Sequence, residues 1–536
     1  EALYESGVRE GDVVTIVLPN VPEIVYLFYA LNRIGAVASL IDPRTNAEAI
    51  LERANEADSR LVFVIWDILQ QKIDGISEKL HAEQIIVVKP SDSLGMGKIH
   101  SVEGLGVSLV YALKGFHDSK KYIWMKDFLK KTAPFQDSPF RPDCMVSILY
   151  TSGTSDAKAK GVVMSNEAYN GMPKQQMGGQ KGFARQNTFL GAIPFFSAFG
   201  SLNGMHNSFC NGWTIIMIPK FHPNDFDLLL KKYKPNNSLG VPRFWESVAD
   251  NGRLDRECLD YLILPTCGGD KISPASVEKV NRFFAEHGAK VKLIVGYGAT
   301  EFGGAISVTT ADEMMYEPGS AGIFMSDVIG LVIDPDTGKV QEGVEKVGEL
   351  YVHTPTMMLG YYKDKAATDE ITYFDENGRK YYRTGDKVRI DSRGINWVID
   401  RYKRIILRPD GHTVGASPIE NVIVSHPLVS GCAVVGIPVD EKSGVIPTAF
   451  LKLKTPVEDP LVDVIRAIDV LCFQKLSERD KALAYVVVDE LPYTLMGKVD
   501  YRKLEETRFG RMQTFWVKDV LTVDKVLPSE DINCFL

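Results

Sequence analysis

Short apolar runs alternate with helix-like patterns over the first 300 residues of the chain. The runs are rich in Val, Ile and Leu, and they are RLVFVIW (60–66), QIIVVKP (84–90), MVSILY (145–150), WTIIMI (213–218), LILPTC (262–267) and KLIVGY (292–297). Continuous apolar runs of this length are typical of parallel strands that are covered on both faces. The pattern therefore predicts a layered α/β fold.

The segment SPASVEKVNRFFAEHGAK, between the last two runs, predicts a helix with defined ends. Ser273 can cap its first turn, Pro274 suits the first helical position, and Gly288 provides the stop. A strand, a helix and a second strand at this spacing support α/β layers.

The pattern changes in two places. Residues 91–140 contain the glycine- and serine-rich stretch SDSLGMGKIHSVEGLG, which predicts a loop-like insertion. Past residue 320, short strands with turns such as DPDTGK and DENGRK predict a small β-rich region. A final α/β unit follows, with a helix at PIENVIVSH, strands at GCAVVGI, TAFLKLK and AYVVVDELP, and a further helix within 460–483.

Composition narrows the class of protein. The chain has 536 residues, more than one hydrophobic core supports, so two or more domains are expected. Its net charge of −8 argues against a nucleic-acid partner. Seven scattered cysteines without metal-type spacing indicate a reducing compartment, and we expect a cytoplasmic protein. Because no run of 18 apolar residues occurs, no integral membrane segment is expected.

The stretch YTSGTSDAKAKGV (150–162) follows a predicted buried strand and is rich in hydroxyl groups. In open α/β sheets, ligands bind at the carboxyl ends of the strands. Glycine permits a sharp turn, hydroxyl and free N–H groups can converge on anionic oxygens, and two lysines add positive charge. The stretch predicts a phosphate-binding loop, although by itself a polar surface turn explains it equally well.

The stretch GYGATE (296–301) also follows a predicted strand. Tyr297 offers a flat face on which a base can stack, and Thr300 offers a hydroxyl group. Glu301 offers the hard oxygen ligand that Mg²⁺ prefers beside phosphates. In isolation, a tight turn with a capping Thr-Glu pair is the better interpretation.

Two later stretches place a charged residue beside a glycine. In YYRTGDKVRI (381–390), Asp386 follows a glycine turn and is suited to accept two hydrogen bonds from ribose hydroxyls. In LPYTLMGKVDYRKL (491–504), Gly497 presents Lys498 at a loop tip. Taken singly, the first stretch is equally explained by an ordinary turn and the second by a solvated lysine.

Taken together, the four stretches closely resemble the adenylate-forming (AMP-binding) family, which includes acyl-CoA synthetases, peptide-synthetase adenylation domains and beetle luciferases. The resemblance begins at GVREGDVVTIVLPNVPEIVYLFYALNRIGAVASLIDP (7–43) and runs to about residue 504. Further matching stretches are PTCGGDKIS (265–273), PGSAG (318–322), GELYVHTPTMMLGYY (348–362) and DRYKRIIL (400–407).

The resemblance implies an α/β protein of the acyl-CoA synthetase type. It implies a large N-terminal AMP-binding domain of layered α/β sheets with a small β-rich subdomain at residues 1–402, a small mobile C-terminal α/β domain at residues 403–505, and a C-terminal extension at residues 506–536. Lys403 matches the family's hinge between these domains. The opening stretch ESGVREGDVV predicts a turn that enters a strand, so we expect that an earlier segment precedes it.

The resemblance also implies a reaction in two halves, in which MgATP and an acid give an acyl-adenylate that a thiol, usually that of coenzyme A, then attacks. Lys498 would bridge the α-phosphate and the substrate carboxylate, Thr300 would touch the α-phosphate, and Glu301 would hold Mg²⁺. The nucleotide-binding residues implied by the family are Thr151, Ser152, Gly153, Thr154 and Lys160 at the β- and γ-phosphates, Gly268, Gly269 and Tyr297 at the adenine, and Asp386 and Arg401 at the ribose.

The substrate pocket of such enzymes is mainly apolar. Phe196, Ser197 and Gly303 would belong to it, with Phe195, Phe199, Cys267, Phe302 and Gly304 as further lining residues. Residues 194–200 lack the aspartate that would bind an ammonium group. A carboxylic acid without an α-amino group is therefore expected, and we favour a fatty or other apolar acid.

Three departures from the family pattern leave alternatives open. The phosphate loop reads SDAKAKG, with Asp156 near a usual glycine and Ala159 at a usual proline. Ser197 stands where histidine is usual, and Ala416 replaces a proline in a loop that normally faces the pantetheine tunnel. An acid–CoA ligase is the leading hypothesis. The alternatives are adenylation with transfer to a separate acyl carrier protein, and a degenerate, non-catalytic nucleotide-binding homologue.

Overall fold

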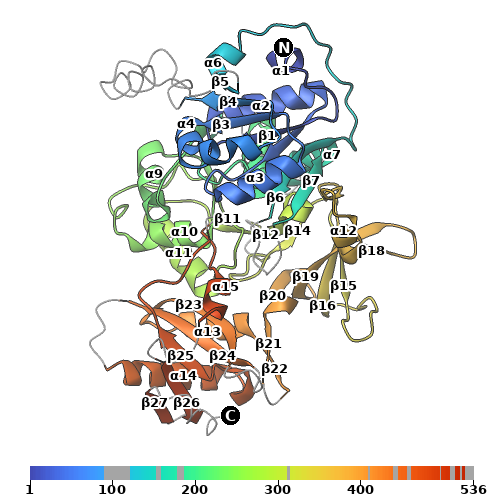
Figure 1. The fold of residues 1–536 in the computed structure, drawn as a ribbon. Coiled ribbons are helices and arrows are strands. Elements are labelled where there is room, and N and C mark those ends of the chain that lie inside the picture. The colour runs from blue at the N-terminus through green and yellow to red at the C-terminus, as the bar shows by residue number, and fades with distance from the viewer. Residues whose placement is uncertain are drawn as a thin grey trace.

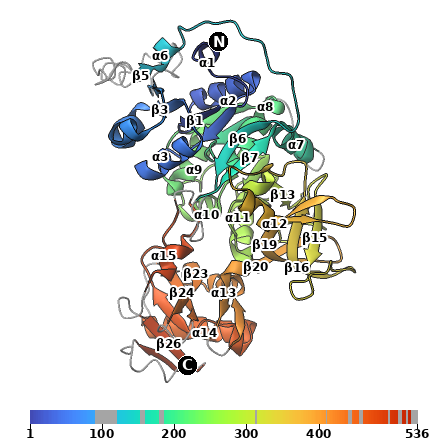
Figure 2. The ribbon, with the colours of Figure 1, turned by 45° about the vertical axis from the view of Figure 1, so that its right-hand side comes forward.

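The computed structural model of the protein describes residues 1–89, 121–151, 159–177, 186–310, 314–408, 411–438, 445–454, 460–494, 497–507, 514–519 and 522–525. Two large sheets with their helices form the upper lobe in Figure 1, and a smaller sheet lies at the side of this lobe. The C-terminal residues, orange to red, form a separate lobe below. Figure 2 shows the same division after a turn of the molecule.

The first large sheet has eight strands in the order β17-β7-β6-β2-β1-β3-β4-β5. They are β1 (Val13–Val17), β2 (Val37–Leu40), β3 (Leu61–Ile65), β4 (Gln84–Val88), β5 (Tyr122–Trp124), β6 (Met145–Tyr150), β7 (Gly161–Ser165) and β17 (Gly360–Tyr361). Strands β1 to β6 pair in parallel, whereas β7 and β17 are antiparallel to their neighbours. Along β3, Phe63 packs into one hydrophobic cluster and Val62 and Val64 into another, so both faces are covered as the apolar run predicts.

The second large sheet has seven strands in the order β14-β13-β12-β11-β10-β8-β9. They are β8 (Thr188–Gly191), β9 (Thr214–Met217), β10 (Asn237–Gly240), β11 (Leu264–Cys267), β12 (Ile294–Ala299), β13 (Gly304–Val308) and β14 (Ile323–Phe324). Strands β8 to β12 pair in parallel, and β13 and β14 run antiparallel. The buried Asn20 joins the two sheets, because its side chain donates to the carbonyls of Gly191 and Ile193 at 2.9 and 3.0 Å.

Two helices show how the sequence defines their ends. Helix α11 (Pro274–Glu286) begins as predicted, since the Ser273 hydroxyl accepts a hydrogen bond from the N–H of Ser276 at 3.0 Å. Helix α2 (Pro22–Ile34) has proline at its first position and ends at Gly35, whose φ of 81° favours glycine. The other helices of the N-terminal lobe are α1 (Ala2–Glu5), α3 (Ala47–Glu56), α4 (Trp66–Ile68), α6 (Met125–Phe128), α7 (Asn166–Met177), α8 (Asn207–Cys210), α9 (Phe226–Tyr233), α10 (Pro242–Asp250) and α12 (Lys365–Ile371).

Short helices of other types complete this lobe. The 3₁₀ segments are Asp74–Lys79, Pro223–Asp225 and Thr300–Phe302, and the π-helical segments are Leu69–Ile73 and Phe199–His206. π-Helical turns are rare in proteins and occur frequently at functional sites. The segment Phe199–His206 is therefore a candidate part of a functional site.

The predicted β-rich region and the C-terminal α/β unit are both present. The small sheet consists of β15 (Ile329–Ile333), β16 (Lys346–His353), β18 (Thr372–Phe374), β19 (Lys380–Ile390) and β20 (Asn396–Arg401). The C-terminal lobe contains the hairpin β21 (Ile405–Leu407) and β22 (Thr413–Gly415), the sheet β23 (Val429–Pro438), β24 (Val445–Leu453), β25 (Ala484–Val487), β26 (Thr514–Asp519) and β27 (Thr522–Lys525), and the helices α13 (Ala416–Val424), α14 (Leu461–Lys475) and α15 (Tyr501–Glu505). Short 3₁₀ segments lie at Tyr402–Arg404 and Glu478–Asp480.

The expectation of a loop-like insertion over residues 91–140 is wrong for residues 122–128, whereas residues 129–140 contain no helix or strand. Residues 90–120 lie outside the described residues, but β5 continues the first sheet beside β4 and is followed by α6. Three-residue strands carry too little pattern to be recognised in a sequence. In the same way, β26 pairs with β25, so part of the expected C-terminal extension completes the last sheet.

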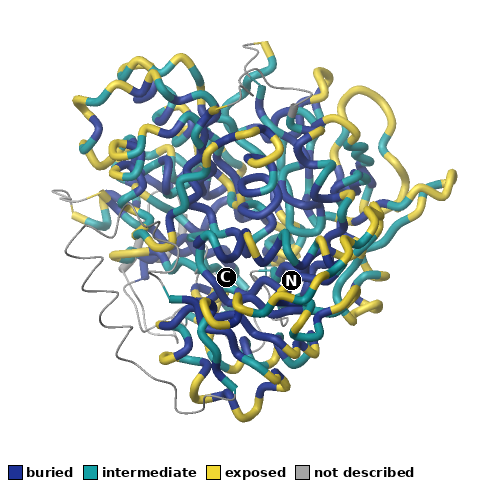
Figure 3. The backbone as a smooth tube through the Cα atoms, turned by 90° about the horizontal axis from the view of Figure 1, so that it is seen from above, coloured by how far each residue is buried: buried dark blue, intermediate teal, exposed yellow. Residues whose placement is uncertain are grey.

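Buried residues gather in the interior of the molecule, and exposed residues lie mainly on peripheral loops (Figure 3). Separate hydrophobic clusters support the first sheet, the second sheet and the C-terminal lobe. Among the described residues, no helix is both long and apolar enough to cross a membrane.

Candidate active site

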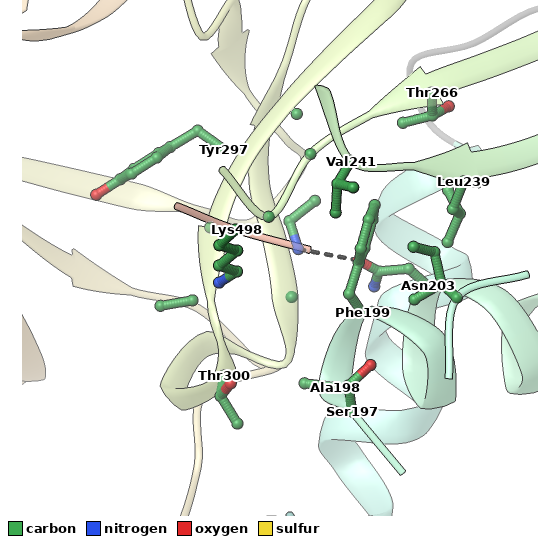
Figure 4. Close-up of a pocket in the computed structure, with 18 of the residues that line it drawn as sticks. Ser197, Ala198, Phe199, Asn203, Leu239, Val241, Thr266, Tyr297, Thr300 and Lys498 are labelled. Carbon is green, nitrogen blue, oxygen red and sulfur yellow. Dashed lines mark hydrogen bonds between the residues drawn. The ribbon is translucent and has the colours of Figure 1, made fainter. Parts of the chain in front are cut away.

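One large cavity, of about 670 Å³, lies where the second sheet meets the C-terminal lobe. Residues along β10, β11 and β12, the loop after β11 and the π-helical segment Phe199–His206 contribute to its wall, and the C-terminal lobe contributes the loop around Lys498. Figure 4 shows Lys498 between Tyr297 and Phe199. The position agrees with the expectation that ligands bind at the carboxyl ends of parallel strands.

A hydrogen-bonded group joins β12, β19 and β20 beside the cavity. The Tyr297 hydroxyl donates to Asp386 at 2.6 Å, and the Arg401 Nε donates to the other oxygen of the same carboxylate at 2.9 Å. Asp386 is 4% exposed, and its charge is the largest influence that raises the pKa of Arg401. A carboxylate has about four lone-pair sites, so Asp386 keeps the capacity to accept from further donors.

A second group surrounds Glu301, which follows β12. The Tyr361 hydroxyl donates to the Glu301 carboxylate at 2.9 Å, and burial, with the adjacent Glu301 charge, raises the pKa of Tyr361. The Lys160 ammonium lies 4.5 Å from the centre of the Tyr361 ring. Lys160 also pairs with Thr151 through their backbones, because the N–H of Thr151 donates to the Lys160 carbonyl at 3.0 Å. The two ends of the predicted phosphate loop are thereby held next to Glu301. Ser152, Gly153 and Thr154 lie outside the described residues.

Lys498 enters the cavity from a tight turn of the C-terminal lobe. Its backbone carbonyl accepts from Thr494 at 2.7 Å, and Gly497 has a φ of 81°, which a side-chain-bearing residue rarely adopts. Burial lowers the pKa of Lys498, an effect that the negative charges of Asp270 and Glu301 oppose. The lysine is therefore a half-buried cation facing carboxylates from the other lobe.

The loop after β11 receives this turn. The Asp270 carboxylate accepts a hydrogen bond from the backbone N–H of Val499 at 3.3 Å. A Cβ atom on Gly269 would stand 3.9 Å from the Lys498 side chain, and the φ of Gly269 is 83°. Gly268 and Gly269 both line the cavity. The sequence analysis assigned no role to Asp270 or Tyr361, although both lie inside stretches that match the family.

The structure places some of the predicted substrate-pocket residues on the cavity wall and others in the core. Phe196, Ser197, Phe199 and Gly304 line the cavity, but Gly303 does not. A Cβ atom on Gly303 would stand 2.8 Å from the Thr356 carbonyl, so its missing side chain serves the packing of the fold. The expected lining residues Phe195, Cys267 and Phe302 are instead core residues.

The Ser197 hydroxyl forms its hydrogen bonds within its own segment. The hydroxyl donates to the Pro194 carbonyl at 2.7 Å and accepts from the Gly200 N–H at 3.1 Å. It therefore stabilises the start of the following helical segment. The side chain still lines the cavity, but its proton has a local partner.

The predicted hinge lies in an exposed turn. Lys403 is exposed and belongs to the 3₁₀ segment Tyr402–Arg404, between the last strand of the small sheet and the first strand of the C-terminal lobe. The next residue, Arg404, donates to Glu420 at 2.6 Å and lies 3.8 Å from the centre of the Tyr501 ring. Arg404 is thus fixed to the C-terminal lobe, and Lys403 is the last exposed residue before that anchor.

The residues around Glu301 fit a magnesium ion that is held mainly by phosphate oxygens. The described residues contain no group of three or more His, Cys, Asp and Glu side chains that could hold a metal by themselves. Mg²⁺ is commonly bound by one or two carboxylates together with substrate phosphates and water. A single carboxylate oriented by Tyr361 meets the protein's part of that requirement.

Comparison with known protein families identifies the class of protein. The profile of the AMP-binding enzyme family matches residues 1–362, and that of the AMP-binding enzyme C-terminal domain matches residues 418–498. The chain therefore belongs to the AMP-binding enzyme family. This result confirms the resemblance that the sequence motifs indicate, and the two-lobed fold agrees with it.

Individual relatives are CoA ligases. The 4-coumarate–CoA ligase-like 2 of Arabidopsis thaliana is 26% identical over 464 residues, which cover 84% of this chain and 74% of the relative. The crystal structure of the anthranilate CoA ligase AuaEII in complex with anthranoyl-AMP has a TM-score of 0.79 and 20% identity, with coverage of 94% and 88%. A benzoate CoA ligase from Burkholderia xenovorans LB400 has a TM-score of 0.77 and 19% identity, with coverage of 94% and 91%. The structural matches establish a shared fold.

Proposed function

We propose that the protein activates a carboxylic acid with ATP and then transfers the acyl group to coenzyme A. The observation that carries the proposal is the position of Lys498, which a different lobe places in the same cavity as Tyr297 and Thr300 (Figure 4). The names of the related CoA ligases support the same activity.

In the first half-reaction, a carboxylate oxygen attacks the α-phosphorus of ATP. A bond forms between this oxygen and the phosphorus, the bond from the phosphorus to the bridging oxygen breaks, and pyrophosphate leaves. Two anions must meet, so positioning and neutralisation of charge supply most of the rate enhancement. The ammonium of Lys498 would lie between the two reactants, and the Thr300 hydroxyl would contact the same phosphate. Magnesium held at Glu301 would neutralise phosphate charge.

The other groups would hold the nucleotide. Asp386, already oriented by Tyr297 and Arg401, would accept hydrogen bonds from the ribose hydroxyls. The Tyr297 ring and the backbone of Gly268 and Gly269 would enclose the adenine. The roles of the phosphate-loop residues, Thr151 and Lys160 among them, remain predictions from the family resemblance.

The second half-reaction needs a different arrangement of the lobes. A thiol must reach the acyl carbon and displace AMP, with its proton passing to solvent or a nearby base. The turn that carries Lys498 occupies the cavity in the arrangement described above, so we propose that the C-terminal lobe rotates about Lys403 between the two steps. Hinge residues of this kind absorb a backbone rotation without contacting the substrate.

The acid would have an apolar body. The residues Phe189, Ile193, Phe196, Phe199 and Leu239 line the cavity. The relatives named above act on aromatic acids according to their names, whereas the sequence analysis favoured a fatty or other apolar acid. The apolar lining of the cavity is compatible with an aromatic acid and with an aliphatic acid.

The proposal is tested by ATP–pyrophosphate exchange with short, medium, long and aromatic acids. We expect exchange that depends on both the acid and magnesium, and thioester formation when coenzyme A is added. A parallel reaction receives holo acyl carrier protein in place of coenzyme A. Thioester formation with the carrier protein but not with coenzyme A would show that a carrier protein is the acceptor. The absence of exchange with every acid of the panel would favour a non-catalytic homologue.

A further inference from the structure

A buried asparagine without a partner lies on the wall of the cavity. Asn237 is the first residue of β10, near the middle of the second sheet, and it is 2% exposed. Both polar atoms of its side chain are buried, and neither has a hydrogen-bond partner among the described residues. Asn237 itself lines the cavity.

The register of the sheet directs this side chain towards the cavity. Asn237 pairs with Phe189 of β8 and with Leu264 of β11, and both of these neighbours also line the cavity. Side chains two residues apart on a strand share a face, so Asn237 shares the face of Leu239, which Figure 4 draws at the cavity wall. The carboxamide therefore lies beside the apolar residues Phe189, Leu239 and Leu264 on the cavity wall.

An unpaired carboxamide in such surroundings is costly. A buried polar group that forms no hydrogen bond loses its solvation without compensation, and native proteins rarely leave both atoms of an amide in that state. A ligand group that both donates and accepts would satisfy the Oδ1 and the Nδ2 together. A hydroxyl group has this capacity.

We propose that Asn237 binds a hydroxyl group at the far end of the acid substrate, which makes Asn237 a determinant of substrate specificity. The inference rests on the proposed acid-activating function. The distance to the carboxylate follows from the sheet. Leu264, the partner of Asn237, stands at the start of β11, and Cys267 stands at its end, two residues before Gly269, where a Cβ atom would be 3.9 Å from the Lys498 side chain. Three residues of strand span about 10 Å. The hydroxyl would lie on the order of 10 Å from the carboxylate.

The test compares pairs of acids that differ only in this hydroxyl. One pair is aromatic, 4-hydroxycinnamic acid with cinnamic acid, and the other is aliphatic, 8-hydroxyoctanoic acid with octanoic acid. In one pair or both, we expect kcat/KM for pyrophosphate exchange to be about 10- to 100-fold higher with the hydroxy acid, which is the effect of leaving one buried polar group unpaired. The pair that shows the preference indicates whether the substrate is aromatic or aliphatic.

The decisive variant is Asn237→Leu, which has a similar size and no polar atom. We expect the preference for the hydroxy acid to fall below about threefold, with an unchanged KM for ATP. The apparent Tm without substrate should stay the same or rise, because the variant removes an unsatisfied buried group. A purely structural asparagine would instead lower the Tm on replacement.

The matched control is Asn396→Leu. Asn396 is also fully buried, and its two polar side-chain atoms also lack partners among the described residues, but it belongs to β20 and does not line the cavity. We expect this variant to keep the wild-type preference. Asn237→Ser provides a second, smaller replacement if Asn237→Leu fails to fold, and it should also weaken the preference.

Two results would overturn the inference while the proposed function stands. They are wild-type exchange that is equal or better with every deoxy acid, and a hydroxyl preference that survives in both Asn237 variants. Either result would mean that water alone satisfies the carboxamide. Absence of exchange with all four acids and with the wider panel would refute the proposed function and this inference together.

Discussion

Replacement of Lys498 by alanine tests the central feature of the site. The Lys498 side chain is half-buried between the two lobes, opposite the charges of Asp270 and Glu301, so water screens its interaction with the reacting phosphate and carboxylate less than at an exposed site. Loss of one preorganised electrostatic contact typically costs about 3–4 kcal/mol of transition-state stabilisation, or about 10²–10³ in rate. We expect Lys498→Ala to slow ATP–pyrophosphate exchange by at least this factor at saturating acid and ATP.

Two further measurements separate the chemical role of Lys498 from a structural one. Thioester formation from a chemically prepared acyl-adenylate and coenzyme A should remain within a few-fold of wild type, because it does not involve the α-phosphate of ATP. The control variant is Lys503→Ala, which removes an exposed lysine of α15 five residues away and should leave exchange unchanged. Wild-type exchange in Lys498→Ala would refute the assigned role, and so would an equal loss in both half-reactions.

The pH dependence gives an independent test of the same side chain. Burial lowers the pKa of Lys498, so the wild-type exchange rate should decline with rising pH below the range of an ordinary lysine. In Lys498→Arg the guanidinium stays charged, so the residual activity should lose this alkaline decline. An unchanged pH profile in Lys498→Arg would assign the decline to another group.

The remaining predictions concern the ribose site, the hinge and acid stability. Asp386→Ala should raise the KM for ATP about 10- to 100-fold in initial-rate assays, because charged hydrogen bonds are worth about 1.5–3 kcal/mol, whereas an unchanged KM would remove Asp386 from the nucleotide site. Lys403→Pro should slow thioester formation and leave pyrophosphate exchange largely intact, because proline fixes φ, and equal effects on both steps would contradict a hinge. Burial lowers the pKa of His206 to about 4, so the unfolded chain binds more protons than the folded protein between about pH 6.5 and pH 4, and stability falls by ~3 kcal/mol as the pH drops through this window. Urea unfolding of His206→Gln at pH 7 and pH 4.5 should show a smaller acid-induced loss than wild type, and an equal loss would place the acid sensitivity elsewhere.

The sequence predicts most of the regular structure because its signals are local. The apolar runs become buried strands, as with β3, β4 and β6, since continuous hydrophobic segments are stable only when both faces are covered. Helix α11 begins at the predicted cap because Ser273 satisfies an N–H of the first turn without help from the rest of the fold. Very short segments cannot be predicted in this way, and β5, which lies within the expected insertion, is an example.

The contacts within the site join residues that are far apart in the sequence. The motifs predict which residues belong to the site but not which of them contact one another. Tyr297, Asp386 and Arg401 each lie in a matching stretch, but the hydrogen bonds that join them depend on how β12 meets the small sheet. The pairing of Glu301 with Tyr361 spans 60 residues and was not predicted. The family resemblance predicts Gly303 in the pocket, but the structure places its Cα against the Thr356 backbone, a contact that no local pattern indicates.

Strand β10 shows why a failure of local prediction is informative. Its sequence, NSLG, contains residue types that are depleted in strands, and no apolar run identified it. The strand nevertheless lies between β8 and β11 in a buried sheet, where a valine or isoleucine at position 237 would fit the local rules better. An asparagine that disagrees with its surroundings and has no partner needs a reason beyond folding, and natural proteins tend to violate such rules at functional sites. The selectivity of Asn237→Leu compared with Asn396→Leu decides whether substrate recognition is that reason at β10.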